Sequence, residues 1–399
     1  MNILFAYNTL LIPSRGGTER VTCTVANALK QKGHHIYFLT TCATPEDSQL
    51  VQDENYFLID KALDTESKKR HVIDICKRLH IDIIINEMGD YDDFSIFSNE
   101  ILPGIKIITC LHLDVNGYII NEPKGFSVTR IKLFIIKALL ATGVLPDSFK
   151  YDLRYGKKCR MMLKVSDAVV TVTPVIATQL KKLTRVHPEK IHSILNPLPM
   201  ALLHPTYNVN KKEKTLLYVG RFAPVKNVDK ILKAWALVAP LHPEWKLELA
   251  GTGELYDECV TLSKQLHIPR VHFLGHVSDV AQLYERAEYL ILASTYESFS
   301  CVVLESMAYG CHPIVFDYPS AKIVIPSHRI GTRIKQHGVK ALASAIYEAI
   351  LTKRSNENHM EEVAKHLARF NIDKLATEWQ LLLEQISTSK KQCLKKSSS

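Results

Sequence analysis

The feature that most constrains this chain is the alternation of short apolar runs with stretches of helical periodicity. Runs rich in β-branched and aromatic residues occupy 2–8, 35–41, 81–87, 105–112, 167–173 and 190–196. Stretches with helical periodicity, such as 18–32, separate these runs. Apolar runs with this spacing indicate parallel strands that are buried on both faces by helices.

The same alternation restarts after a break in the middle of the chain. Residues 196–205 are rich in proline and residues 207–214 are polar, which is typical of a linker. Further strands are expected at 215–220, 246–251, 271–275, 288–294 and 312–316, and the chain closes with helices expected at 339–352, 357–370 and 372–386. Two halves of the same architecture therefore follow one another.

A chain of 399 residues with 46% hydrophobic content is long enough to bury two cores. The predicted fold class is α/β, with two doubly wound, Rossmann-like domains whose ligand loops lie at the carboxyl ends of the strands and face a cleft. We expect a first domain at 1–197, a linker at 198–213, a second domain at 214–370, a C-terminal helix at 371–388 that could cross back to the first domain, and a disordered tail at 389–399.

Composition excludes several classes of protein. The nine cysteines are scattered, without a CxxC pair or a histidine cluster at zinc spacing, so we expect neither a disulfide framework nor a structural metal. The N-terminus has no basic start or small-residue cleavage site, and uncharged apolar runs are shorter than a membrane span. We therefore expect the protein to be cytoplasmic, either free or bound peripherally to the inner face of the cytoplasmic membrane.

The net charge of +9 is concentrated in one segment. Residues 124–164 hold ten cations and two anions, which gives +8. A helix at 130–145 would be apolar on one face with Arg130, Lys132 and Lys137 at its borders, which suits an anionic membrane surface. An ordinary amphipathic helix packed on the first domain explains the pattern equally well. Aromatic interleaving is sparse and nucleic-acid motifs are lacking, so nucleic acid is not an expected partner.

Two loops carry residue types that suit a phosphate group. Gly16 and Gly17 precede a helix, where small residues and bare N–H groups favour an anion. Gly220, Arg221 and Lys226 follow the strand at 215–220, and their two cations could bind a diphosphate, although solvated surface cations are an equal alternative. The G-x-G of the 251–254 loop lacks the third glycine of a dinucleotide fingerprint, and a helix-entry turn accounts for Gly251.

The stretch YESFSCVVLE, residues 296–305, places two carboxylates around a helix start. Glu297 is expected in a loop after the strand at 288–294, Ser300 is expected to be the N-cap, and Glu305 falls in the second turn of the helix that begins at Cys301. Carboxylates bind sugar hydroxyls, and a nucleotide sugar has hydroxyls on both sides of its diphosphate. The alternative is that both glutamates are solvated surface charges.

Taken in order, GGTERV, YVGRFAPVKN, ELAGTGE, FLGHVSD and STYESFSCVVLESMAYGCHPIV resemble the motifs of GT-B glycosyltransferases, in particular the retaining family 4 with its E-x7-E signature. The resemblance covers about residues 1–385. It implies that Glu297 contacts the donor sugar, Glu305 the ribose, and Arg221 with Lys226 the diphosphate, while the Gly16–Gly17 loop closes from the first domain. Gly220, Gly251, Ser300 and Cys301 complete the predicted donor site. Ser298 and Ser300 depart from the family, which most often has glycines there.

Two further stretches contain candidate site residues. A histidine near the end of the corresponding strand often lies beside the transferred sugar and the acceptor in the family, which implies a catalytic role for His112. The DYDD stretch at 90–93 contains a DxD, but it lacks a nucleotide-binding context, so a solvated acidic loop is favoured over a metal site. We therefore predict catalysis without a metal or another cofactor.

The predicted function is transfer of a sugar from a nucleotide diphosphate donor, UDP-linked, to a hydroxyl of a glycan or lipid-linked acceptor, as in surface polysaccharide synthesis. Glu297, His112, Arg221 and Lys226 are the predicted catalytic residues. Two alternatives remain: a sugar-nucleotide epimerase, which needs no acceptor, and a non-catalytic nucleotide-sugar-binding or membrane-adaptor protein, which binds without turnover. The donor sugar, the acceptor and the linkage do not follow from the residues.

Overall fold

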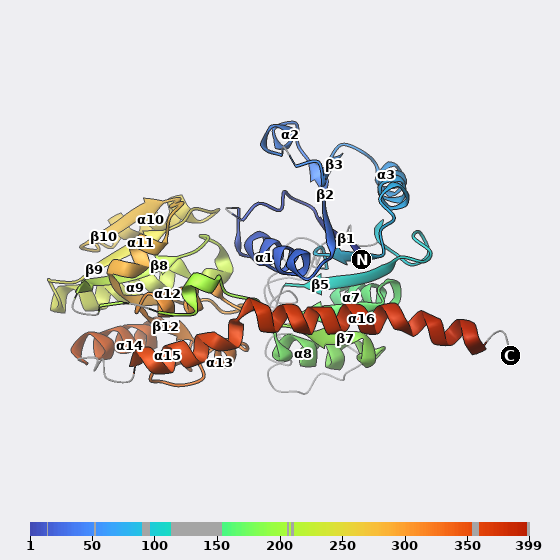
Figure 1. The fold of residues 1–399 in the computed structure, drawn as a ribbon. Helices are drawn as coiled ribbons and strands as arrows, with labels where there is room; N and C mark the ends of the chain where they lie inside the picture. The colour runs from blue at the N-terminus through green and yellow to red at the C-terminus, as the bar shows by residue number, and fades with distance from the viewer. Residues whose placement is uncertain are drawn as a thin grey trace. The chain divides into compact units, whose positions relative to one another are not determined.

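The computed structural model describes residues 1–13, 15–51, 53–89, 96–112, 154–205, 207–208, 211–352 and 359–396. The chain divides into two compact units (Figure 1). Met1–Pro197 and Ile372–Ser399 form the first unit, and Leu198–Asn371 form the second. Residues 198–213, expected to be a linker, are therefore part of the second unit, where Leu198 makes a parallel bridge with Asn371.

The first unit contains a seven-stranded sheet in the order β3-β2-β1-β4-β5-β6-β7, with every described pairing parallel. The strand order reverses between β1 and β4, which is where ligands bind in open α/β sheets. The strands are β1 (Asn2–Tyr7), β2 (His35–Ala43), β3 (Tyr56–Asp60), β4 (Ile83–Asn86), β5 (Lys106–Leu111), β6 (Ala168–Thr171) and β7 (Ile191–Ser193).

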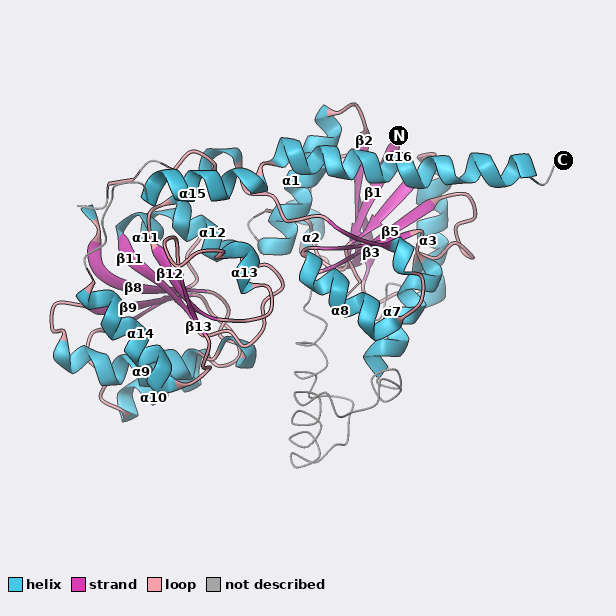
Figure 2. Cartoon of the chain, turned by 90° about the horizontal axis from the view of Figure 1, so that it is seen from below, coloured by secondary structure: helices cyan, strands magenta, loops and turns pink. Residues whose placement is uncertain are grey.

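Helices cover both faces of this sheet (Figure 2). They are α1 (Gly17–Gln31), α2 (Asp47–Leu50), α3 (Thr65–Arg78), α7 (Arg154–Val165), α8 (Pro174–Thr184) and α16 (Ile372–Lys396), with a 3₁₀ turn at Pro188–Lys190. The sequence explains where α3 and α8 begin. The side chains of Asp64 and Thr173 are N-caps that accept hydrogen bonds from N–H groups of the first turn.

Helix α16 returns the chain to the first unit. It packs against α1, and the Gln380 side chain lies 2.6 Å from His34 Nε2. Its backbone is helical to Lys396, so residues 389–396 continue the helix where the sequence led us to expect a disordered tail.

The second unit contains a six-stranded parallel sheet in the order β10-β9-β8-β11-β12-β13. Its strands are β8 (Glu213–Val219), β9 (Lys246–Ala250), β10 (Val271–Gly275), β11 (Ala287–Leu292), β12 (His312–Phe316) and β13 (Thr332–Ile334). Its helices are α9 (Val228–Val238), α10 (Tyr256–Gln265), α11 (Ala281–Arg286), α12 (Cys301–Ala308), α13 (Ala321–Val324), α14 (Val339–Leu351) and α15 (His359–Leu367). Short 3₁₀ turns are at Met200–Leu202, Pro224–Lys226, Ala239–Leu241 and Ala368–Phe370.

In the second unit α9, α10 and α14 lie on one face of the sheet, and α11, α12 and α15 lie on the other (Figure 2). The central strands are almost fully buried; β12, for example, has five buried residues in a row. The prediction of two doubly wound parallel sheets is confirmed. Two strands, β3 and β13, were not predicted, and each lies at an edge of its sheet.

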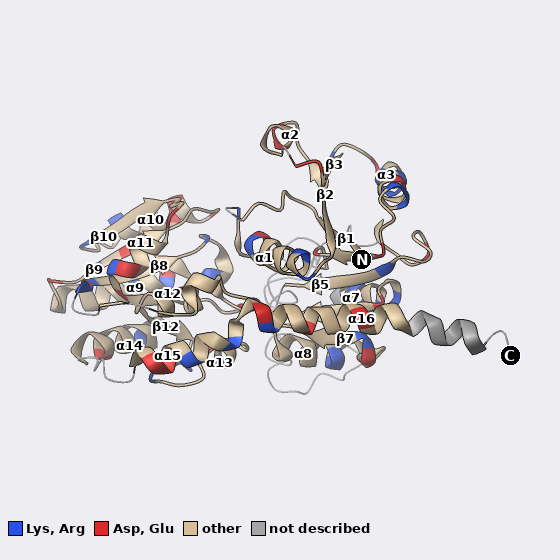
Figure 3. Cartoon of the chain, in the orientation of Figure 1, with Lys and Arg blue, Asp and Glu red and all other residues tan. Residues whose placement is uncertain are grey.

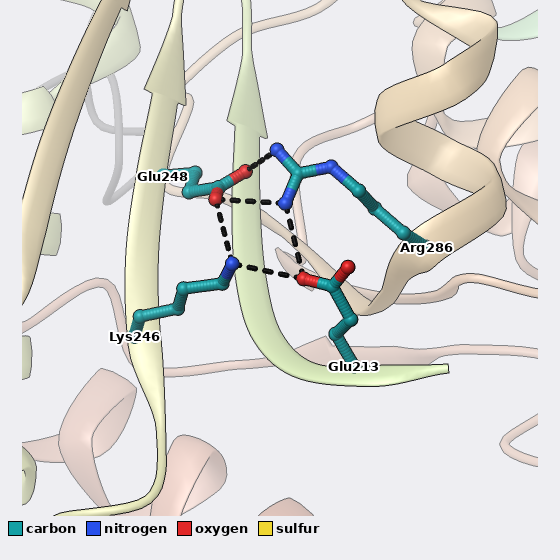
Figure 4. Close-up of polar contacts among 4 residues, drawn as sticks. All are labelled: Glu213, Lys246, Glu248 and Arg286. Carbon is teal, nitrogen blue, oxygen red and sulfur yellow. Dashed lines mark hydrogen bonds and ion pairs between the residues drawn. The ribbon is translucent and has the colours of Figure 1, made fainter. Parts of the chain in front are cut away.

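Four charged side chains gather at the amino end of the second sheet (Figure 4). Glu213 begins β8, Lys246 and Glu248 lie on β9, and Arg286 ends α11 immediately before β11. Lys246 Nζ lies 2.8 Å from Glu213 and 3.1 Å from Glu248, while Arg286 contacts both glutamates and binds Glu248 with two nitrogens. The network ties the starts of two strands to the end of a helix.

Candidate active site

The loop after β8 brings the predicted cations to the carboxyl end of the second sheet. Gly220 follows the strand, the Arg221 residue is exposed, and Lys226 ends the short 3₁₀ turn Pro224–Lys226. The Tyr218 hydroxyl donates a 2.8 Å hydrogen bond to the Arg221 carbonyl, which fixes the backbone of the loop. The guanidinium is thus presented to solvent by an anchored main chain.

Lys226 and Glu297 form an ion pair across two loops. Lys226 Nζ lies 2.5 Å from Glu297 Oε1, and the two side chains are 24% and 11% exposed. Glu297 follows β11, which is the strand next to β8 in the sheet. Because parallel neighbours end at the same edge, two residues 71 positions apart meet there. The structure therefore brings together two of the residues predicted to bind the donor.

Uncharged hydrogen bonds hold these two loops against each other. The Asn227 side chain donates 2.8 Å bonds to the Ala293 carbonyl and to Thr295 Oγ1, and the Thr295 N–H donates a 2.9 Å bond to the Val225 carbonyl. The buried Ser320 hydroxyl donates a 2.6 Å bond to the Glu297 carbonyl. Ser320 lies after β12. The loops that follow the neighbouring strands β8, β11 and β12 therefore position the carboxylate of Glu297 together.

Ser300 precedes α12, as predicted, but it does not cap the helix with its side chain. Its backbone is left-handed, with φ of 68° and ψ of 64°, and this conformation turns the hydroxyl away from the first-turn N–H groups. The left-handed region disfavours residues with a Cβ, so a glycine would adopt this backbone conformation at a lower cost. Ser300 itself is buried, and Cys301, the first residue of α12, is half-buried.

Glu305 is buried, not a solvated charge on the surface of α12. Only 4% of the residue is exposed, and the Tyr284 hydroxyl of α11 lies 3.5 Å from Glu305 Oε2. A carboxylate held inside the unit in this way is costly unless polar groups meet it. The alternative that both glutamates are solvated surface charges is therefore wrong for Glu305.

The glycines of the 251–254 loop serve close packing against the Arg221 loop. Gly251 has φ of +133°, and a Cβ there would lie 1.9 Å from the Gly220 carbonyl oxygen. Gly253 has φ of +150°, and a Cβ there would lie 2.6 Å from the Phe222 carbonyl oxygen. Side chains at either glycine would push away the loop that carries Arg221. Gly251 therefore supports the predicted donor site by allowing the Arg221 loop to pack closely against it.

Buried tyrosines mark the low-dielectric surroundings of Glu297. Burial, and then the nearby Glu297 carboxylate, raise the pKa of both Tyr218 and Tyr318 well above the usual tyrosine range. Their hydroxyls therefore stay protonated over the working pH range and remain hydrogen-bond donors.

In the first unit, the Gly16–Gly17 turn starts α1 but already has an acidic neighbour. Gly16 is the N-cap, and a Cβ added to it would lie 2.5 Å from Glu19 Oε2. Glu19 thus occupies the first turn, where a negative charge is favourable. A phosphate that approached these N–H groups would have to displace or neutralise this carboxylate.

His112 lies one residue beyond β5, and Glu87 lies one residue beyond β4. Their side chains meet, with His112 Nε2 2.6 Å from Glu87 Oε2, and they are 13% and 4% exposed. Sequence reasoning missed Glu87. The available signal was its place at the end of the apolar run 81–87, on the strand that neighbours β5.

A pocket within the first unit contains this pair. Side chains of α1, of the ends of β4, β5 and β6, of the segment after β7 and of α16 line it, among them Thr22, Cys110, Asn196 and Trp379. Its wall is mainly apolar, so the Glu87–His112 pair supplies most of its capacity for polar recognition.

Two predictions fall outside the described residues. The DYDD stretch at 90–93 lies there, as does the helix expected at 130–145. Of the basic segment 124–164, the structure describes the part in α7, where Lys157 and Lys164 are exposed. Figure 3 colours lysine and arginine blue on the described part of the chain. Among the described residues, none of the helices is both long and apolar enough to span a membrane.

Two family models match the chain. The model described as Glycosyltransferase Family 4 matches residues 15–201, and the model described as Glycosyl transferases group 1 matches residues 201–367. An uncharacterized glycosyltransferase of Haemophilus influenzae is 26% identical over 93% of this chain and 97% of that protein. The alpha-monoglucosyldiacylglycerol synthase of Streptococcus pneumoniae is 26% identical over 92% of this chain and 83% of that protein.

The solved structure of Anabaena HepE in complex with UDP and glucose has the same fold, with a TM-score of 0.72, 15% identity and coverage of 96% of this chain and 100% of that one. The two parallel sheets, each with helices on both faces, therefore have the GT-B fold. The chain belongs to glycosyltransferase family 4, the glycosyl transferases group 1. These matches favour the transferase over the epimerase and the adaptor protein.

Proposed function

We propose that this glycosyltransferase moves a sugar from a UDP-linked donor to a hydroxyl of a glycan or lipid-linked glycan, with retention and without a metal ion. The observation that carries the proposal is the Lys226–Glu297 ion pair at 2.5 Å, in the same loop system as the exposed Arg221. Two cations suit a diphosphate, and a carboxylate beside them suits the hydroxyls of the sugar.

The residues have separate roles in this proposal. Arg221 and Lys226 stabilise the negative charge that grows on the departing phosphate, and Glu297 orients the sugar through its hydroxyls. The bond from the anomeric carbon to the phosphate oxygen breaks while the acceptor oxygen bonds to the same face. The acceptor proton passes to the departing phosphate, so neither a metal nor a protein nucleophile is required.

The relatives support the choice of donor and acceptor. HepE binds UDP and glucose, and the pneumococcal synthase is named for a glucosylated diacylglycerol. A UDP-sugar and a lipid-linked hydroxyl are therefore the first substrates to test. Glycan acceptors of surface polysaccharides are the second group.

A panel of nucleotide sugars tests the proposal. We expect one UDP-sugar to raise the melting temperature of the protein and to be hydrolysed slowly without an acceptor. Transfer should persist in EDTA, because the proposed charge stabilisation comes from Arg221 and Lys226. Loss of transfer in EDTA that manganese restores would contradict the metal-independent mechanism, and the product's anomeric configuration tests retention.

We also propose that residues 124–164 dock the enzyme on an anionic membrane, where each cation contributes about 1 kcal/mol. Replacing Arg130, Lys132 and Lys137 by glutamine should release the protein from anionic vesicles at low salt and leave UDP affinity unchanged. A matched control replaces three exposed lysines of the second unit, Lys211, Lys264 and Lys365. Equal release of both variants, or wild-type protein that never sediments with vesicles, would contradict a specific docking segment.

A further inference from the structure

Three side chains with metal-binding chemistry converge in the pocket of the first unit. Cys110 lies on β5 and His112 lies two residues later, so both point to the same side of the sheet. Glu87 comes from the neighbouring strand end, because Asn86 on β4 pairs with Thr109 on β5. The ligand atoms of the three side chains all lie within 4.8 Å of one another.

A thiolate, an imidazole and a carboxylate are the three ligand types that zinc takes from proteins. Zinc bonds of about 2.0–2.3 Å place tetrahedral ligands roughly 3.3–3.8 Å apart. The His112–Glu87 contact of 2.6 Å would have to open by roughly 0.7 Å to admit the ion, which small side-chain rotations can supply. Three protein ligands leave one position for water.

The surroundings also suit a cation. Glu87 and Cys110 are each 3% exposed, and the side chain of His112, which also lines the pocket, is 13% exposed. A divalent ion would be neutralised by the carboxylate and the thiolate together, which is the condition for keeping charges in a buried site. On binding, the thiol would lose its proton to solvent, and His112 would bind the ion through an unprotonated ring nitrogen.

We propose that Glu87, Cys110 and His112 form a zinc site and that its occupancy inhibits sugar transfer. The inhibition rests on the proposed function and on the predicted catalytic role of His112, whose imidazole zinc would bind. Zinc binding itself does not depend on turnover. The ion acts here as an inhibitor, so the site agrees with catalysis that needs no metal.

The first test measures binding on the full chain without a substrate. Zinc affinity is measured by competition with a chromophoric chelator in wild type, Cys110→Ser, Glu87→Gln and Cys76→Ser. Cys76 is the matched control, a buried thiol on α3. Loss of an outer-shell partner alone weakens zinc sites 10–100-fold, so we expect Cys110→Ser to weaken binding at least about tenfold and Cys76→Ser to leave it unchanged.

Cobalt gives an independent signal, since a cysteine thiolate bound to Co²⁺ produces an intense charge-transfer absorption. Wild type and Cys76→Ser should show this absorption, and Cys110→Ser should lack it. Equal zinc affinity in wild type and Cys110→Ser, with no cobalt–thiolate absorption, would overturn the site. Thermal unfolding of each variant separates loss of a ligand from loss of the fold.

The second test measures transfer with stoichiometric zinc, each variant compared with its own zinc-free rate. We expect wild type and Cys76→Ser to be inhibited and EDTA to restore them, while Cys110→Ser resists inhibition. Tight zinc binding without inhibition would overturn the inhibitory role. A protein that binds zinc as expected but transfers no sugar from any donor would refute the proposed function and leave the metal site standing.

Discussion

Charged side chains are arranged in two different ways at the two ends of the second unit's sheet. At the amino end, Glu213, Lys246, Glu248 and Arg286 form a closed network in which every charge has two partners of opposite sign (Figure 4). At the carboxyl end, Lys226 and Glu297 form a single pair in the same loop system as the exposed Arg221. The charges of the network are all paired with one another, whereas Lys226 has N–H donors that a ligand can use.

The pKa values of the network agree with this difference. The hydrogen bond from Lys246, and then its charge and that of Arg286, lower the pKa of Glu213, and the hydrogen bond to Glu213 raises the pKa of Lys246. Glu213 and Lys246 thus stabilise each other in their ionised forms. An ammonium has three donors, and the described contacts of Lys226 use one of them on Glu297, so two remain for phosphate oxygens.

The largest expected effect comes from removing one charge at the carboxyl end. Glu297→Gln should lower kcat by about 10²–10³-fold, as loss of one transition-state hydrogen-bond partner does elsewhere, and leave UDP affinity nearly unchanged. The matched control is Glu248→Gln, the same change at the amino end, which should retain kcat. Kinetics and calorimetry with UDP give both quantities. Equal losses of kcat in the two variants would remove the distinction between the two ends.

A smaller effect is expected for the second glutamate of the signature. Glu305→Ala should weaken UDP binding by about 1.5–3 kcal/mol for each hydrogen bond lost to the charged carboxylate, or roughly 10–150-fold for one bond. Tyr284→Phe is the matched control, because it removes the hydroxyl 3.5 Å from Glu305 and keeps the carboxylate. Unchanged UDP affinity in Glu305→Ala would show that the ribose assignment is wrong.

The sequence predicted the central strands and the loops that follow them, but not the edge strands. The loops at 220–227 and 293–300 were identified because they follow strands that read as continuous apolar runs, and central parallel strands have that character. The edge strands β3 and β13 were missed, since β3 is half-exposed over most of its length and β13 has three residues. Their formation depends on a neighbour in the sheet more than on their own pattern.

The sequence predicted which side chains contact each other only where both belong to a known motif. The Glu87–His112 pair and the four-charge network depend on which strands become neighbours and in what register. Apart from Lys246 and Glu248, which share one strand, 25 to 73 residues separate the partners. Ser300 illustrates the converse case. Its residue type suggested an N-cap, but its backbone is left-handed and its side chain makes no capping bond.

A stability effect at the amino end is the third prediction. Glu248→Gln should lower the free energy of unfolding by about 1.5–3 kcal/mol, because the negative charge and one of the two oxygens that accept from the cations are lost at a side chain that is 6% exposed. Lys233→Gln breaks an exposed pair with Asp229, both 44% exposed, and should cost less than about 0.5 kcal/mol. Denaturant unfolding followed by tryptophan fluorescence suits the measurement, since Trp235 and Trp245 lie in the second unit. Equal costs would mean that closure of the network adds nothing.

The smallest effect is a dependence of stability on pH at the same network. Because the folded-state pKa of Glu213 is lowered, its contribution is fully present above the unfolded pKa of about 4.3 and is lost as the pH falls through the folded value. Its side chain is 46% exposed, so the contribution should stay below about 1 kcal/mol. The melting temperatures of wild type and Glu213→Gln should therefore differ by at most about 4 °C at pH 7 and converge toward pH 3. A difference that persists at pH 3 would show that Glu213 stabilises the strand start by packing and not by its charge.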